Sequence, residues 1–183
     1  MAFLVARYLE ALRRRPLETN CASAMVVTSC GDVISQILER REWDAVRTAK
    51  LSLWGAVWMG PSSTLWFRWL ERFGGGARGL AIKVALNQST MAPLTNGLFY
   101  LYSELWGPFA TLRQRYSTRM TNEFAATMLA SVSVWVPTQT FNFAVVPPFL
   151  RPLFLNVAFV LWTAHLSYRG HKTYDCDADS EPQ

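Results

Sequence analysis

The sequence has few of the residues on which most metal and redox sites depend. Its three cysteines, Cys21, Cys30 and Cys176, are odd in number and show no C-x-x-C spacing, so neither a disulfide framework nor a zinc site is predicted. The two histidines, His165 and His171, lie six residues apart and lack the four-residue spacing that puts two metal ligands on one helix face. We therefore expect no metal and no cofactor.

Catalytic motifs are also scarce. The sequence contains no P-loop and no G-x-S-x-G nucleophile elbow, which disfavours nucleotide hydrolysis and α/β-hydrolase chemistry. His165 and Ser167 stand close together, as an intramembrane serine hydrolase would need, but on a helix Ser167 points away from His165. An intramembrane enzyme is therefore the least favoured function, and we expect the protein not to be an enzyme.

Charge is absent from long parts of the chain. Hydrophobic residues make up 51% of the sequence, yet the mean hydropathy of +0.10 is low for a membrane protein, so the argument rests on where the charges lie. About 20 apolar residues in a helix cross a bilayer, whereas a soluble helix of that length needs a charged face. Four stretches without Asp, Glu, Lys or Arg hold 17, 20, 27 and 17 residues: 51–67, 84–103, 124–150 and 152–168.

These stretches predict an all-α protein, a polytopic transmembrane helical bundle with four spans and an ambiguous fifth helix. Asp44 is expected to cap the second span, and the amphipathic stretch 107–123 is expected to lie at the membrane interface. The spans are about 19–38, 44–70, 82–105 and 124–146, and the ambiguous helix is 152–168. We expect helices to kink or end at Gly60, Pro61, Pro93, Pro137 and Pro147.

The two ends of the chain have different compositions. Residues 1–19 combine arginines with apolar residues in an amphipathic pattern, but Glu10 and Glu18 argue against a cleaved transit peptide. We predict a retained surface helix that ends near Pro16. The domain prediction is one membrane-embedded unit over 1–174, followed by a disordered acidic tail at 175–183. The formal net charge of +5 suits anionic lipid headgroups, and without an aromatic-interleaved basic platform we expect no nucleic-acid partner.

Six polar side chains lie inside the predicted spans, where they should face the bundle interior or a watery cavity. Asp32 shares one side of its helix with Thr28 and Gln36. The six could form interhelical hydrogen bonds of about 0.6 to 2 kcal/mol each, or they could line an aqueous path. We expect Gln88, Gln139 and Asn142 to face Asp32, and Arg151 could pair with Asp32. The six residues are Asp32, Gln36, Asn87, Gln88, Gln139 and Asn142.

The order of these motifs resembles one family over nearly the whole chain, the small organellar membrane proteins named after Mpv-seventeen and the twenty-two-kilodalton peroxisomal membrane protein. Gly31-Asp32-x-Ile34-x-Gln36 is similar to the first-helix motif of that family. The other matching motifs are Tyr8-x-x-x-Leu12-x-x-x-Pro16-x-x-Thr19, Asp44-x-x-Arg47, Gly60-Pro61, Trp66-Phe67-x-x-Leu70, Gln88 ahead of Pro93, Trp135 through Gln139-x-x-Asn142-Phe143-x-x-Val146-Pro147-x-x-x-Arg151, and Trp162-x-x-x-Leu166-Ser167.

The resemblance implies an integral protein of the mitochondrial inner membrane, with the peroxisomal membrane as the alternative. It also implies a weakly selective pore for small solutes, linked to inner-membrane homeostasis and mitochondrial DNA maintenance. Its partners would be the lipid bilayer and small-molecule or ion solutes, and self-association is compatible with it. Asp44, Arg47 and Arg151 are the motif residues suited to an ion pair or an interface. The competing interpretation is a non-conducting membrane scaffold.

The chain departs from the family pattern at three places. Thr64 stands where the family usually has His, and Asn87 stands where it usually has Asp. The family's adjacent Trp-Pro is separated here as Trp135-Val136-Pro137. Because Asn87 removes one intramembrane carboxylate, we expect any charge-dependent selectivity of this chain to differ from that of the family.

Overall fold

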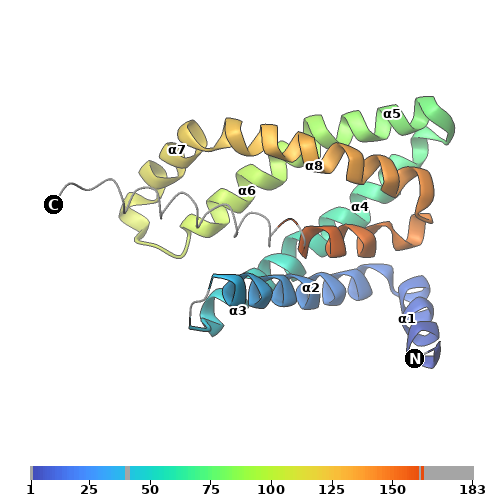
Figure 1. The fold of residues 1–183 in the computed structure, drawn as a ribbon, viewed down its shortest axis with the longest axis horizontal. Helices are drawn as coiled ribbons and strands as arrows, with labels where there is room; N and C mark the ends of the chain where they lie inside the picture. The colour runs from blue at the N-terminus through green and yellow to red at the C-terminus, as the bar shows by residue number, and fades with distance from the viewer. Residues whose placement is uncertain (1, 40–41, 161, 163–183) are drawn as a thin grey trace. The chain divides into compact units, whose positions relative to one another are not determined.

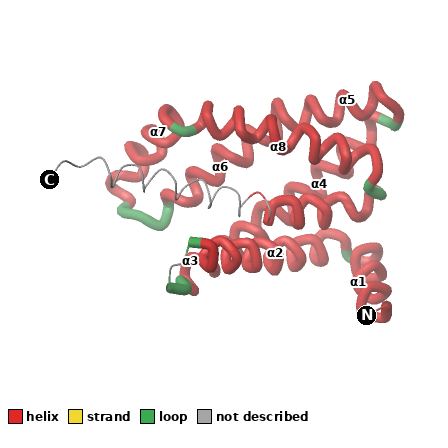
Figure 2. The backbone as a smooth tube through the Cα atoms, viewed as in Figure 1, coloured by secondary structure: helices red, strands yellow, loops and turns green. Residues whose placement is uncertain are grey.

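The computed structural model describes residues 2–39, 42–160 and 162 (Figure 1). All of the secondary structure assigned to these residues is helical (Figure 2), which confirms the all-α prediction. The predicted tail at 175–183 and the end of the predicted helix 152–168 lie outside the described residues. The chain divides into two compact units, Met1–Trp69 with Pro147–Gln183 (unit 1) and Leu70–Val146 (unit 2). The prediction of a single domain over 1–174 remains a prediction.

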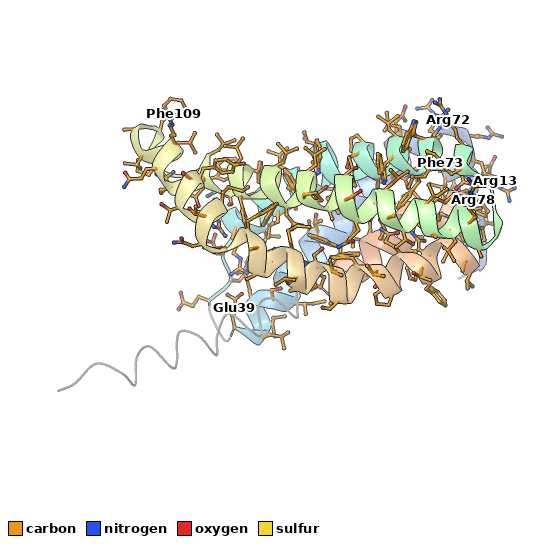
Figure 3. The ribbon with its side chains drawn as sticks, turned by 90° about the horizontal axis from the view of Figure 1, so that it is seen from above. Arg13, Glu39, Arg72, Phe73, Arg78 and Phe109 are labelled. Atoms are coloured by element: carbon orange, nitrogen blue, oxygen red, sulfur yellow. The ribbon has the colours of Figure 1, made fainter. Side chains whose placement is uncertain are left out.

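Unit 1 is organised around one long helix. Helix α1 (Ala2–Arg14) is followed directly by α2 (Pro16–Leu38), because Pro16 suits the first position of a helix, where no backbone donor is needed. Helix α2 packs against α1, against α3 (Ala45–Trp54) and against the π-turn η1 (Gly55–Met59). Figure 3 shows Arg13 and Glu39 at opposite ends of this unit.

The start of α3 is fixed by Asp44. Its carboxylate accepts hydrogen bonds from the backbone N–H groups of Val46 and Arg47 at 2.9 and 3.0 Å, as an N-cap does. The rest of unit 1 comprises α4 (Gly60–Leu70), whose last residue already belongs to unit 2, the short η5 (Pro148–Leu150) and helical residues 151–160.

A π-turn joins α3 to α4 where a kink was expected at Gly60-Pro61. The N–H of Gly60 donates to the carbonyl of Gly55, five residues earlier, and Pro61 has no N–H to continue an α-helical ladder. Both glycines face α2 closely. A Cβ on Gly60 would lie 2.5 Å from the Cα of Cys21, and one on Gly55 would collide with the side chain of Thr28. The helix therefore continues, with one wider turn, against a tightly packed neighbour.

Unit 2 begins with η2 (Glu71–Phe73) and a turn in which Gly74 and Gly76 have positive φ of 66° and 76°, a conformation that glycine adopts without steric cost. A second π-turn, η3 (Asn87–Met91), joins α5 (Gly76–Leu86) to α6 (Ala92–Glu104), just before Pro93. Figure 3 shows Arg72 and Arg78 at one end of this unit and Phe109 at the other.

The remainder of unit 2 returns along these helices. After η4 (Phe109–Thr111), the predicted interfacial stretch forms α7 (Leu112–Asn122). Helix α8 (Phe124–Val145) then packs against α5, η3, α6 and α7, and Figure 1 shows it running alongside α5 and α6. It continues through Pro137 and ends before Pro147, so only the second of these prolines terminates a helix.

The predicted number of four spans is not confirmed. Among the described helices, α2 alone combines a length of 23 residues with a mean hydropathy of 1.4 over its most apolar part. The second and third predicted spans fall on helices that π-turns divide into α-helical pieces of 10 to 13 residues. The physical reason is the proline after each π-turn, which removes one donor from the α-helical ladder.

Candidate functional site: buried polar clusters in the two units

The carboxylate of Asp32 is fully buried in unit 1 and completely hydrogen-bonded. Arg47 Nε donates to Asp32 Oδ1 at 2.8 Å. Gln36 Nε2 and Thr48 Oγ1 both donate to Asp32 Oδ2 at 2.7 Å. The donors come from α2 and α3, so one buried carboxylate connects the two helices. We call Asp32, Gln36, Glu39, Asp44, Arg47 and Thr48 the Asp32 cluster.

Arg47 is shared between two acidic residues. Its Nη1 and Nη2 donate to the two carboxylate oxygens of Glu39 at 2.7 and 2.9 Å, the bidentate geometry that guanidinium groups favour. The guanidinium group of an arginine is charged at every physiological pH, so Arg47 bridges the carboxylates of Asp32 and Glu39.

Gln36 extends the cluster to the loop before α3. Its Oε1 accepts from the backbone N–H of Asp44 at 2.5 Å, and its Nε2 donates to the Asp44 carbonyl at 3.1 Å. Thr28, Asp32 and Gln36, the face that the sequence indicated, are all buried. Of the predicted ion-pair residues, the structure brings Asp44 and Arg47 together with Asp32, and it places Arg151 as a buried residue of unit 1.

A second set of buried polar side chains lies in unit 2, where α5 and η3 pack against α8. We call Lys83, Asn87, Gln139 and Asn142 the Lys83 cluster; all four are buried. The Nζ of Lys83 lies 5.8 Å from the centre of the Phe143 ring. On the same helix as Phe143, Asn142 Nδ2 donates to Gln139 Oε1 at 3.2 Å, so two predicted site residues are hydrogen-bonded to each other.

Further along the same packing surface, Gln88 Nε2 donates to Ser131 Oγ at 3.4 Å, and the hydroxyls of Tyr100 and Thr127 are 2.6 Å apart. Residue 83 contacts residue 143, and residue 100 contacts residue 127. Because the numbers rise on one side as they fall on the other, α8 runs antiparallel to α5 and α6. The polar side chains of unit 2 therefore form a row along α8 whose members are buried or half-buried. Because Asp32 belongs to the other unit, the expectation that Gln88, Gln139 and Asn142 face it remains a prediction.

Three buried amide atoms have no hydrogen-bond partner among the described residues: Asn20 Oδ1, Asn142 Oδ1 and Asn156 Nδ2. The other end of Asn20 donates to Thr64 Oγ1 at 2.9 Å, and Thr64 donates to the Gly60 carbonyl at 2.7 Å. An unpaired amide end buried in protein costs about 1 to 3 kcal/mol, so these three atoms are the polar groups that the described residues leave unsatisfied.

Sequence reasoning missed several of these residues. Asn20 lies inside the first predicted span and Asn156 inside the ambiguous fifth helix, so the same search for intramembrane polarity could have found both. Lys83 lies at the start of the third predicted span, and its burial depends on α8, which is distant in sequence.

The connection between α6 and α7 carries a third ionic group, which fastens the loop. Glu104 accepts from Arg115 Nε at 2.7 Å and from Arg119 Nη1 at 3.3 Å. Arg115 also donates to the carbonyls of Glu104 and Pro108, and Arg119 lies over the Tyr100 ring at 4.6 Å. These contacts hold α7 against α6.

The described residues support neither a metal site nor a dinucleotide-binding site. In the described part of the chain no group of three or more His, Cys, Asp or Glu residues could hold a metal ion. Residues 74–79 read G-x-G-x-x-G, but they follow a helix, whereas the dinucleotide-binding motif follows a strand.

One described helix, α2, is long and apolar enough to cross a membrane, and an all-helical chain with buried amides fits the class of α-helical membrane proteins. The Mpv17 / PMP22 family matches residues 113–167. The chain is 32% identical over 162 residues to Protein SYM1 of Mycosarcoma maydis, a match that covers 85% of this chain and 80% of that protein. The chain belongs to the Mpv17 / PMP22 family.

Other relatives agree over similar lengths. Identity to Protein sym-1 of Neurospora crassa is 29% over 174 residues, or 90% of this chain and 98% of that protein. Identity to the Mitochondrial inner membrane protein Mpv17 of Caenorhabditis briggsae is 27% over 169 residues, a match that covers 91% of this chain and 92% of that protein. Because its relatives include proteins named for the mitochondrial inner membrane, the chain is a protein of that membrane. No solved structure matches the chain.

Proposed function

We propose that this protein is a multi-pass membrane protein that forms a weakly selective pore for small solutes. The observation that carries the proposal is the row of polar side chains in unit 2, above all Asn142, which is fully buried and has an amide oxygen without a partner among the described residues. In hydrocarbon an unpaired amide is costly and is expected to face a watery cavity. Water in a solute path would provide the missing hydrogen bond.

The proposal includes four spans and a fifth helix over 152–168. Residues 45–70 and 76–104 are helical without interruption when the π-turns are counted with the helices around them. At about 1.5 Å per residue, each run is long enough for a hydrocarbon core of about 30 Å. The π-turns leave backbone groups irregularly bonded, which is tolerated at membrane depth where protein or water satisfies them.

The proposed solutes are small molecules or ions, and the proposed environment is the lipid bilayer. Self-association is compatible with the proposal, and no nucleic-acid partner is proposed. We propose no enzymatic activity. A pore in the inner membrane would connect the protein with inner-membrane homeostasis and, through solute supply, with mitochondrial DNA maintenance.

A non-conducting scaffold is the second candidate, and the Asp32 cluster favours it. Asp32 is buried and accepts hydrogen bonds from three side chains of its own unit. A carboxylate held in this way fastens α2 to α3 and leaves no free charge to select solutes. The Asp32 cluster is therefore structural under both candidates, and the two candidates differ in what unit 2 does.

Conductance of the purified full chain in liposomes separates the two candidates. Asn142→Leu removes the unpaired amide and keeps the number and branching of the side-chain heavy atoms, and Thr140→Val, at an exposed position of the same helix, is the matched control. We expect the wild type and Thr140→Val to conduct equally and Asn142→Leu to conduct less, with all three resisting protease equally. A wild type that does not conduct would favour the scaffold.

A further inference from the structure

Lys83 is a buried cation whose donors are not used by the protein. The residue is 5% exposed, and its recorded contacts among the described residues are the Phe143 ring at 5.8 Å and Glu71 Oε1 at 3.6 Å. A charge-assisted hydrogen bond between nitrogen and oxygen measures about 2.7 to 2.9 Å, so the contact with Glu71 is too long to be one. The ammonium therefore has three donors and no hydrogen bond within the described part of the chain.

Burying a charge without a close partner is costly, and proteins usually neutralise or pair such groups. Arg47 in unit 1 shows the usual solution, with two carboxylates at 2.7 to 2.9 Å. Glu71 cannot play that part for Lys83, because its side chain is 40% exposed and remains hydrated. Lys83 is therefore available to bind an anion, because an anion that approaches its ammonium group more closely can displace Glu71.

The surroundings of Lys83 suit an oxyanion. Asn87 lies one helical turn further along the same face of the helix. Asn142, the residue before Phe143, has one amide end hydrogen-bonded to Gln139 and the other unpaired. The Asn142 and Gln139 amides can reverse together and keep the same hydrogen bond between them, since each carries a donor and an acceptor. The reversed pair presents the Asn142 NH₂ group as a second donor.

We propose that the Lys83 cluster binds a small phosphate-like oxyanion, with Lys83 as its charged donor and Asn142 as a neutral one. The oxyanion is either a free solute or the headgroup of an anionic phospholipid, and both share this chemistry. The inference rests on the proposed function only in that a free oxyanion would be a solute of the proposed pore. Binding itself requires no conduction.

The test is thermal unfolding of the full chain in maltoside micelles, which contain no phosphate, with inorganic phosphate titrated at constant ionic strength. Phosphate should raise the unfolding temperature of the wild type by binding to the folded state. Lys83→Gln should weaken the apparent phosphate affinity about tenfold or more, as expected for the loss of a charged hydrogen-bond donor. Arg78→Gln removes the same charge from an exposed position of α5 and should leave the affinity unchanged.

Glu71→Gln provides a second variant that does not touch the proposed site residue. Removal of the competing carboxylate should strengthen phosphate binding, so this arm decides the question even if Lys83→Gln fails to fold. Nanodiscs of phosphatidylcholine with and without an anionic phospholipid distinguish the two sources. If the lipid is the ligand, it should stabilise the wild type but not Lys83→Gln, and free phosphate in micelles should have no effect.

Equal responses of the wild type, Lys83→Gln and Glu71→Gln to phosphate and to anionic lipid would overturn the inference. Failure of the pore proposal would look different, because liposomes would then show no conductance whatever the binding results. Phosphate stabilisation that depends on Lys83, in a protein that does not conduct, would leave the oxyanion site in place and remove only the pore.

Discussion

Arg47 in unit 1 and Lys83 in unit 2 differ in what surrounds them. Arg47 in unit 1 meets two carboxylates, and the buried Asp32 beside it accepts two further hydrogen bonds. Lys83 in unit 2 is more deeply buried than Arg47, yet it has one distant carboxylate and an aromatic ring. A buried charge that is saturated by its own fold serves stability. A buried charge that the fold leaves unsaturated retains free donors for something else.

The largest effect should follow Arg47→Met. It would leave the fully buried Asp32 without its cation, and breaking a buried pair by removing one partner costs about 3 kcal/mol or more. Chemical unfolding in micelles measures the loss. The control is Arg14→Met, which breaks the exposed pair with Glu10 and should cost less than about 1 kcal/mol. Similar losses for the two variants would remove the distinction between the Asp32 cluster and a surface ion pair.

A loss of about 1 to 3 kcal/mol is expected for Gly60→Ala, because the new Cβ would meet the backbone of α2 and overpacking has this cost. This variant disturbs unit 1 without changing any charge. Gly75→Ala is the control, since nothing lies within 4 Å of its added Cβ. Unfolding curves of the two variants should differ clearly; if Gly60→Ala is as stable as Gly75→Ala, the close approach of α2 to the π-turn is not energetically important.

Asp32→Asn should have a smaller effect, about 1 to 2 kcal/mol, because the amide keeps the shape but replaces one acceptor oxygen by an NH₂ group that faces a donor. We expect the reversal potential in liposomes under a salt gradient to stay at the wild-type value, since Asp32 is enclosed by its own cluster. A changed cation-over-anion preference in a stably folded Asp32→Asn protein would place Asp32 on the conducting path and contradict this assignment.

The smallest change in stability should be that of Lys83→Met, within about 1 kcal/mol of the wild type and of either sign. Replacing a weakly paired buried charge by an apolar side chain of similar length is often neutral or stabilising. The same unfolding assay without phosphate measures it beside Arg47→Met. A loss for Lys83→Met as large as that for Arg47→Met would mean that both cations are structural.

Much of unit 1 could be predicted from the sequence because its main features are local. The first predicted span ends at Leu38 as α2 does, the polar face through Asp32 follows from a four-residue spacing, and Asp44 caps the next helix. The sequence allowed Arg151 to pair with Asp32, and the structure places Arg47 there, with one hydrogen bond from its Nε. That choice depends on how α3 packs on α2, which helical periodicity does not contain.

Unit 2 was harder to predict for the same reason. Its helices were located, but the prolines were expected to kink them, and the structure accommodates Pro93 by a π-turn. Lys83 was assigned to the edge of a span because sequence distance hides its neighbour Phe143 on α8. A buried charge with only a distant partner becomes visible only when the packing of distant helices is known.

The π-turn of unit 1 also bears on how the length of this segment can change. Five residues of an α-helix turn by about 500°, which would leave Gly55 and Gly60 about 140° apart around the axis, whereas the π-turn stacks them. Deleting one residue from 56–59 would leave the two glycines four apart, joined by an ordinary α-turn and still facing α2. A deletion within α4 would instead rotate every later side chain by about 100°. This segment can therefore lose one residue without changing the phase of the helix that follows.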